Sequence, residues 1–435
     1  MKTLSTLALI AISNLALAAA PVVCKVELDR GTLPADRTER AVIKVSLTAP
    51  EIVRRTDRPP VNLAIVLDRS GSMSGDKIRN AQNAAIEALR HLGSSDLYSL
   101  VVYNHNVETL VPAQSASNMD YIESRIREIH ANGNTALFSG VSQGAVELRK
   151  NLAESYVHRV ILLSDGLANV GPSSPHELGR LGSSLLKENI AVSTVGVGTD
   201  YNEDLMTRLS QNSDGNAYFV QNSDDLPSIF AEELGDVLSI MARRVKIEIE
   251  FDNGVRPVRI IGRDGRLDEH RAEIQLNQLY GGQEKFALIE VEIPAQTAGN
   301  TLKLATANCV YEDVLDQAER QAQATVAANF SAVKKDVVES VNVNVQRDLA
   351  RNELAATQDY AVELVDQGNA PQAAQELRKK AEEIKERAQK YGIELDDEVA
   401  ELETQSETLE EAGSMDKVMR KSFRTNSYQI RNQQQ

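Results

Sequence analysis

Polar residues that suit a metal ion follow one of the most apolar runs in the chain. The segment Asp68-Arg69-Ser70-Gly71-Ser72 comes directly after the apolar run from Val61 to Leu67. One carboxylate and two hydroxyls, spaced two residues apart, offer the oxygen ligands that hard divalent cations prefer. Mg²⁺ in particular is held by only one or two carboxylates and keeps positions for water or a partner's oxygen. Such a loop is common at strand ends, so alone it predicts a cation site only weakly.

Two later loops strengthen this prediction. Thr135 lies in Asn132-Gly133-Asn134-Thr135, where glycine permits a tight turn that presents the hydroxyl. Asp165 lies in Ser164-Asp165-Gly166, directly after another apolar run. Ligands of open α/β sheets bind beside the carboxyl ends of the strands, so these loops are expected at one sheet edge. The alternative is that these residues only cap helices and form turns, where Ser and Asp are favoured.

At these residues the sequence resembles a von Willebrand factor A domain with an intact metal-ion-dependent adhesion site. The resemblance covers about Val61 to Ile240 and includes DRSGSM, the threonine loop and SDG in the family's order. It implies a metal set, with the three hydroxyls as direct ligands and the two aspartates acting largely through water: Asp68, Ser70, Ser72, Thr135 and Asp165. One departure is Asn134, where the family often has glycine. The residues expected to rim the metal are Arg69, Met73, Asn134 and Leu167.

The expected ion is Mg²⁺, with Mn²⁺ or Ca²⁺ as alternatives. If hydroxyls and water supply most of its ligands, the ion stays under-neutralised and attracts a carboxylate of a partner protein, from Asp or Glu. The resemblance therefore implies an adhesion or interaction module. A competing hypothesis is an envelope scaffold in which the metal merely stabilises a loop.

Unbroken apolar runs alternating with helical patterns predict a mostly parallel, doubly wound sheet that carries these loops. The expected strands are Val61 to Leu67, Leu97 to Tyr103, His158 to Ser164, Ile190 to Val197 and Asn216 to Val220. Residues 21–60 and 242–332 alternate instead, as half-buried antiparallel strands do. The simplest assembly inserts the α/β domain, residues 61–241, into one split β-sandwich. This embedding resembles exported bacterial members of the family and, more distantly, inter-alpha-trypsin inhibitor heavy chains.

Residues 333–435 are rich in Ala, Glu, Gln and Lys and are predicted to be helical. Apolar residues from Ala374 to Tyr391 recur at spacings of three and four, which favours a helical hairpin or a coiled coil. This region is either a packed appendage or an arm for a helical partner or self-association. The polar end, from Thr425 to Gln435, is expected to fray.

Residues 1–20 have the pattern of a cleaved export signal, with Lys2 before an apolar stretch and small residues at its end. The protein is therefore expected in the periplasm or outside the cell, with no membrane span in the mature chain. In such an oxidising compartment the two cysteines, Cys24 and Cys309, are expected to form one disulfide, the alternative being two free thiols. The formal net charge of -16, with basic residues scattered among the acids, argues against a nucleic-acid partner.

The enzyme classes considered have weak support in the sequence. A magnesium-dependent phosphatase could use Asp68 as a nucleophile, but such enzymes usually have a second acid where this chain has Ser70. The six histidines form no His-Glu-x-x-His motif. No Gly-x-Ser-x-Gly motif or phosphate-binding glycine loop is present either. The sequence thus favours a protein that is not an enzyme.

Overall fold

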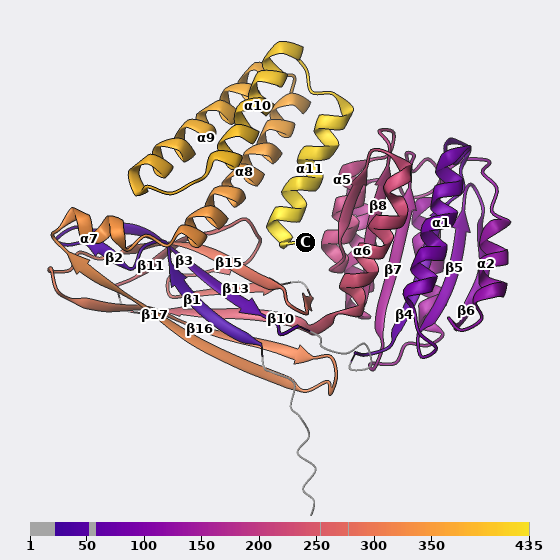
Figure 1. Ribbon diagram of the computed structural model, residues 1–435, viewed down its shortest axis with the longest axis horizontal. Coiled ribbons are helices and arrows are strands. Elements are labelled where there is room, and N and C mark those ends of the chain that lie inside the picture. The colour runs from indigo at the N-terminus through magenta and orange to yellow at the C-terminus, as the bar shows by residue number, and fades with distance from the viewer. Residues whose placement is uncertain (1–21, 52–57, 253, 277, 435) are drawn as a thin grey trace, which may run out of the picture.

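The computed structural model describes residues 22–51, 58–252, 254–276 and 278–434. It contains an α/β domain, a pair of antiparallel sheets and a group of C-terminal helices, which lie side by side in Figure 1. The predicted export signal, residues 1–20, lies outside the described residues. In the described ranges no helix is both long enough and apolar enough to cross a membrane.

The α/β domain is built on one six-stranded sheet with the order β6-β5-β4-β7-β8-β9. All neighbouring pairs are parallel except β5 and β6. The five predicted strands are present, with bounds that differ by one residue at most, and β6 is an addition to the prediction. The strands are β4 (Val61–Asp68), β5 (Leu97–Tyr103), β6 (Val107–Ser115), β7 (Val157–Ser164), β8 (Ile190–Val197) and β9 (Ala217–Val220).

Helices cover both faces of this sheet, which explains why β4 and β7 are buried along their whole length. Alternate residues of β4 enter different cores, because successive side chains of a strand point to opposite faces. Leu63 and Ile65 pack with α1 (Asp76–His91), α2 (Met119–Arg127) and α6 (Leu226–Leu238). Ala64 and Val66 pack with α3 (Leu137–Arg149), α4 (Pro175–Lys187) and α5 (Glu203–Ser213). Two short 3-10 helices complete the domain, η1 (Gly71–Met73) and η2 (Ser223–Asp225).

The β-sandwich combines strands from both sides of the α/β domain. Its first sheet has the order β1 (Val23–Leu28), β3 (Glu39–Thr48), β15 (Glu284–Ile293) and β11 (Arg256–Ile261). β3 pairs antiparallel with β15 over ten residue pairs, with Ile43 opposite Ile289. Because β3 precedes the α/β domain and β15 follows it, the domain is inserted into the sandwich, as predicted.

The second sheet has the strand order β12-β13-β10-β16-β17-β2. In addition, β14 pairs with β10. Its strands are β12 (Arg266–Leu267), β13 (Arg271–Leu276), β14 (Leu279–Tyr280), β10 (Ile240–Phe251), β16 (Thr301–Asp313), β17 (Glu319–Ser331) and β2 (Thr32–Pro34). The short strand β2 lies between β1 and β3 in the chain and pairs parallel with β17.

The two cysteines lie on facing strands of different sheets, Cys24 on β1 and Cys309 on β16. Their Sγ atoms are 3.1 Å apart, so the fold brings together residues separated by 285 positions. Both are thiols in this structure, and the disulfide stays a prediction.

The C-terminal helices pack around a core of their own. They are α7 (Lys334–Glu339), α8 (Val343–Asp366), α9 (Ala370–Tyr391), α10 (Asp396–Ala412) and α11 (Lys417–Asn432). The first turns of α8 also cover the outer face of the first sheet, where Val345 and Leu349 join its apolar residues.

The prediction of a frayed C-terminal end is wrong, because α11 binds to the α/β domain. The hydroxyl of Tyr428 donates to the carbonyl of Gly215 at 2.5 Å, and the side-chain amide of Gln429 donates to the carbonyl of Ala217 at 3.0 Å. The buried ammonium of Lys421 donates to Glu203 at 2.5 Å. These polar contacts join residues that are far apart in the sequence, so the composition of the C-terminal segment alone could not predict them.

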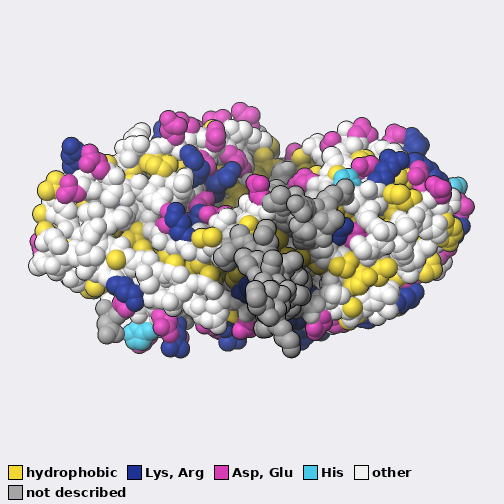
Figure 2. Space-filling view, turned by 60° about the horizontal axis from the view of Figure 1, so that its bottom comes forward, with side chains coloured by type: hydrophobic (Ala, Val, Ile, Leu, Met, Phe, Trp, Pro, Cys, Tyr) yellow, Lys and Arg dark blue, Asp and Glu magenta, His cyan; other side chains and the backbone are white. Residues whose placement is uncertain are grey.

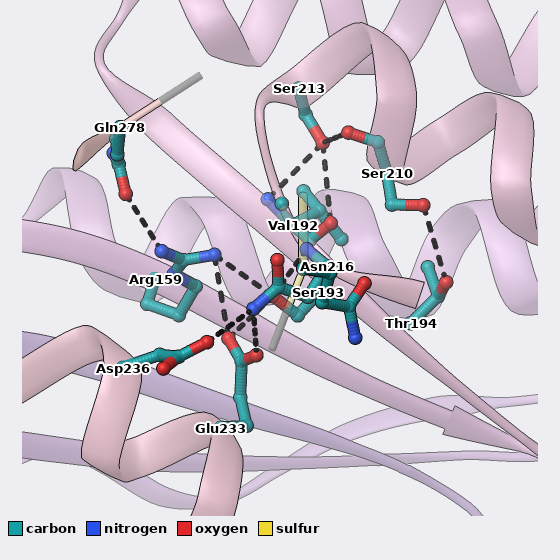
Figure 3. Close-up of polar contacts among 12 residues, drawn as sticks. Arg159, Val192, Ser193, Thr194, Ser210, Ser213, Asn216, Glu233, Asp236 and Gln278 are labelled. Carbon is teal, nitrogen blue, oxygen red and sulfur yellow. Dashed lines mark hydrogen bonds and ion pairs between the residues drawn. The ribbon is translucent and has the colours of Figure 1, made fainter. Parts of the chain in front are cut away.

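A buried polar network joins the α/β domain to the sandwich in the amino-terminal halves of β7 and β8 (Figure 3). Arg159 and Glu233 have no exposed surface, and Arg159 Nη1 lies 3.4 Å from Glu233 Oε1. Arg159 also donates to Gln278 at 2.7 Å, on the segment that leads to β14. The network therefore lies toward the amino ends of the strands, away from the predicted metal loops at their carboxyl ends.

Charges of both signs are mixed over the described surface in Figure 2, where Lys and Arg side chains lie among Asp and Glu side chains. Among the described residues drawn on that face, the basic side chains do not gather into one continuous patch.

Candidate metal centre

The Asp68 carboxylate is buried at the end of β4 and has no exposed surface. Its Oδ1 accepts a hydrogen bond from the backbone N–H of Ser70 at 2.7 Å. Its Oδ2 accepts one from the hydroxyl of Ser164, the last residue of β7, at 2.7 Å. Asp68 therefore fixes the start of its own loop and connects it to the neighbouring strand.

The two serine hydroxyls of the same loop connect it by hydrogen bonds to Asp165. Ser70 Oγ and Ser72 Oγ lie 3.1 Å apart, and Ser72 Oγ donates to Asp165 Oδ1 at 2.6 Å. The other oxygen of Asp165 accepts a hydrogen bond from Lys77 Nζ at 2.5 Å. The structure thus brings four of the five predicted ligands into one hydrogen-bonded chain.

Thr135, the fifth predicted ligand, lies beside this chain. A Cβ atom added at Gly166 would lie 3.3 Å from Ser72 Oγ and 3.5 Å from Thr135 Oγ1, so both hydroxyls face the same point. The Thr135 backbone is held by Asn169, whose side-chain oxygen accepts from Thr135 N at 2.8 Å. Glycine at position 166 leaves open the space between the two hydroxyls.

Backbone hydrogen bonds hold the loops against one another. Gly71 N donates to the carbonyl of Gly133 at 2.9 Å, and Asn132 N donates to the carbonyl of Arg69 at 2.8 Å. Gly133 has φ +77°, and a Cβ atom there would lie 2.2 Å from the His105 ring. The threonine loop therefore needs glycine at this turn.

The sequence model described as "von Willebrand factor type A domain" matches residues 62–232, which include all three loops. Residues 62–232 are a von Willebrand factor type A (VWA) domain. The sandwich and the C-terminal helices lie outside the matched residues.

Curated relatives match about half of this chain or slightly more. The uncharacterized protein YfbK of Escherichia coli (strain K12) is 27% identical over 268 residues, which make up 60% of this chain and 46% of that protein. Inter-alpha-trypsin inhibitor heavy chain H2 of Sus scrofa is 28% identical over 211 residues, or 46% of this chain and 22% of that protein. The chain spans less than half the length of both relatives.

Solved structures share the arrangement beyond the VWA domain. The von Willebrand factor type A protein from Catenulispora acidiphila aligns with a TM-score of 0.69 at 17% identity, covering 94% of this chain and 97% of that one. The ArnB paralog VWA2 from Sulfolobus acidocaldarius aligns with a TM-score of 0.57 at 15% identity, covering 94% and 98%. These likenesses show that the VWA domain, antiparallel sheets and helices occur together elsewhere as one fold.

The electrostatics of the VWA loops favour a cation. Burial raises the pKa of Asp68 to about 6; the hydrogen bonds from Ser70 and Ser164 lower it, and the nearby Asp165 raises it further. Tyr103 is fully buried, and burial together with both carboxylates keeps the pKa of its hydroxyl well above the ordinary value. Two buried carboxylates beside three hydroxyl oxygens form a donor set that fits a hard divalent ion.

The four expected rim residues of the VWA site differ in their exposure. Asn134 and Leu167 are exposed, and 58% of the surface of Leu167 is accessible to solvent. Arg69 is partly exposed and lies 3.1 Å from Glu108 in an ion pair. Met73 does not belong to the rim, because η1 turns its side chain into the domain core and leaves it 0% exposed.

Sequence reasoning missed three residues of the VWA site: Ser164, Asn169 and Lys77. Ser164 immediately precedes Asp165 at a strand end, so its position could have drawn attention to it. Lys77 lies five residues after Ser72, in the first turn of α1. No group of three or more His, Cys, Asp or Glu side chains is placed to hold a metal ion in the described ranges. Three of the five proposed ligands are Ser and Thr hydroxyls, which do not belong to those four residue types.

Proposed function

We propose that the chain is a metal-dependent protein-binding module that coordinates one divalent cation, Mg²⁺, and captures a partner's Asp or Glu carboxylate through it. The observation that carries this proposal is the continuous contact of Ser70, Ser72 and Asp165, with Asp68 and Thr135 beside it. VWA domains are commonly metal-dependent protein-interaction modules, which supports the same reading.

The chemistry follows from the donor set. Ser70, Ser72 and Thr135 would offer neutral hydroxyl oxygens, and Asp68 and Asp165 would supply negative charge around the ion. Few charged ligands leave an ion electron-poor, so an anionic oxygen from outside is a favourable further ligand. Leu167 and Asn134 are exposed beside Asp165 and Thr135, where they would contact such a partner.

A binding role suits Asp68 better than the phosphatase alternative does. A nucleophilic carboxylate must reach its substrate, yet Asp68 has no exposed surface. Both of its oxygens already accept hydrogen bonds, from Ser70 and Ser164. We therefore propose a function without catalysis.

We also propose that the chain is exported to the periplasm or beyond the cell and carries a Cys24–Cys309 disulfide. The export-signal pattern of residues 1–20 and the 3.1 Å between the two sulfurs support this. The division into residues 21–60, 61–241, 242–332 and 333–435 belongs to the same proposal. The helical region remains a candidate for a helical partner or self-association.

Calorimetric titration of the chelator-stripped chain with Mg²⁺ tests the metal site. Wild type should bind one ion, and Asp68→Ala should lose that binding while its circular dichroism spectrum stays native. Asp120→Ala is the matched control, because Asp120 is an exposed aspartate on α2. Equal Mg²⁺ binding by wild type and Asp68→Ala would rule out this site.

Capture experiments separate partner binding from a structural metal. Wild type coupled to beads should retain a partner from an envelope extract in Mg²⁺ and release it in chelator, and Asp68→Ala should retain none. A purely structural ion would instead lower the melting temperature on removal without any Mg²⁺-dependent capture.

A further inference from the structure

We propose that Lys77 tunes the metal site, weakening its hold on the ion so that the occupied site keeps a positive charge for the partner's carboxylate. This inference rests on the proposed function and assigns a role to a residue outside the predicted ligand set. Its basis is the contact of Lys77 Nζ with Asp165 Oδ2 at 2.5 Å.

Lys77 is the cation that contacts one of the two buried carboxylates of the site, that of Asp165. Asp165 is 0% exposed, and among the described residues Lys77 is its ion-pair partner. Asp68 has no ion pair in the same described ranges, since its partners are the Ser70 N–H and the Ser164 hydroxyl. One ammonium therefore compensates two neighbouring carboxylates.

The position of Lys77 is not explained by helix stability. It is the second residue of α1, and the amino end of a helix favours acidic side chains over basic ones. The side chain nevertheless folds toward Asp165, and a Cβ atom at Gly198 would lie 3.7 Å from its Nζ. Lys77 thus lies between Asp165 and the backbone after β8, with 32% of its side chain exposed.

Charge balance gives Lys77 two opposite effects. Two carboxylates neutralise a divalent ion, so without Lys77 the occupied site would have no net charge. With Lys77 one positive charge remains, which repels the metal and attracts an anionic oxygen.

Metal titration of chelator-stripped protein tests the first effect. Lys77→Met should bind Mn²⁺ and Mg²⁺ roughly tenfold more tightly than wild type, since it removes a positive charge that is in contact with the proposed ligand Asp165. Lys77→Arg keeps the charge and should stay near the wild-type affinity. Lys187→Met is the matched control, because Lys187 is an exposed lysine at the end of α4, at the opposite edge of the sheet.

Acetate serves as the carboxylate probe for the second effect. Water-proton relaxation by bound Mn²⁺ falls when acetate replaces metal-bound water, so the acetate concentration at half effect reports carboxylate affinity. Lys77→Met should need several times more acetate than wild type or Lys187→Met.

The proposal fails if Lys77→Met binds Mn²⁺ no more tightly than wild type, or if its acetate response is unchanged. Lys77→Gln supplies the same test should Lys77→Met not fold. If wild type binds the ion and Asp68→Ala does not, an unchanged Lys77→Met overturns only this inference. If wild type binds no ion, the proposed function falls with it.

Discussion

Replacement of Arg159 by methionine should destabilise the VWA domain strongly, although Arg159 is far from the metal loops. Its guanidinium is fully buried and contacts Ser193 at 2.9 Å, Gln278 at 2.7 Å and Glu233 at 3.4 Å (Figure 3). Methionine keeps the aliphatic length of the side chain and removes its charge and donors. The Glu233 carboxylate is then buried without its cation.

The expected loss is about 3 to 5 kcal/mol of unfolding free energy, the usual cost of leaving one member of a buried ion pair alone. Glu233 keeps neutral hydrogen bonds from Ser193 at 2.5 Å, Asn216 at 2.8 Å and Tyr218 at 3.0 Å, which favours the lower end. Removing both charges, in Arg159→Met with Glu233→Gln, should cost clearly less than the sum of the single changes.

Urea denaturation followed by far-ultraviolet circular dichroism measures these losses, because the chain has no tryptophan for fluorescence. Arg149→Met is the control, since Arg149 forms an exposed pair with Glu188 in the same domain. It should cost less than about 1 kcal/mol. The coupling between Arg159 and Glu233 would be refuted if the losses of the two single variants summed to the loss of the double variant within about 0.5 kcal/mol.

Three further predictions follow from other parts of the fold. Burial lowers the pKa of Lys285 to about 7, so stability should rise between pH 7 and the ordinary lysine value of 10.5, where only the unfolded chain binds the extra proton. Urea midpoints of Lys285→Met should lack this rise. Gly144→Ala would place a methyl group 2.6 Å from a valine methyl of β4 and should cost about 1 to 3 kcal/mol in thermal melts. Gly235→Ala, in open space on α6, should instead stabilise by up to about 1 kcal/mol. Non-reducing peptide maps of the exported protein should show Cys24 linked to Cys309, and full alkylation of both thiols would reject the bridge.

Local sequence patterns were sufficient to predict the five parallel strands of the VWA sheet and the loops that follow them, but not the antiparallel β6. A strand buried on both faces requires an unbroken apolar run, and this signal is readable within eight residues, as in Val61–Asp68. The approach of Asp68 to Asp165 also followed, because parallel strands end at one edge. The insertion into a split sandwich was predictable from alternation on both sides of the domain.

Other features depended on contacts between distant segments. The sequence could not show that Met73 turns inward, because one residue in a short loop has no periodicity. It also could not place α11 on the VWA domain, since the contacts of α11, such as the hydrogen bond of Tyr428 to Gly215, join residues more than 200 positions apart. The order of the strands in the sandwich, with β2 beside β17, likewise arises from packing.

The sequence by itself determined the ligand types at the proposed metal site, because Asp, Ser and Thr oxygens define which ions would suit it. Tertiary structure alone decided the charge around them. Lys77 reaches Asp165 and Ser164 reaches Asp68 only after the strands align and α1 packs on the sheet. Charge interactions depend on distance in space and on burial, and neither quantity is written in the spacing of residues along the chain.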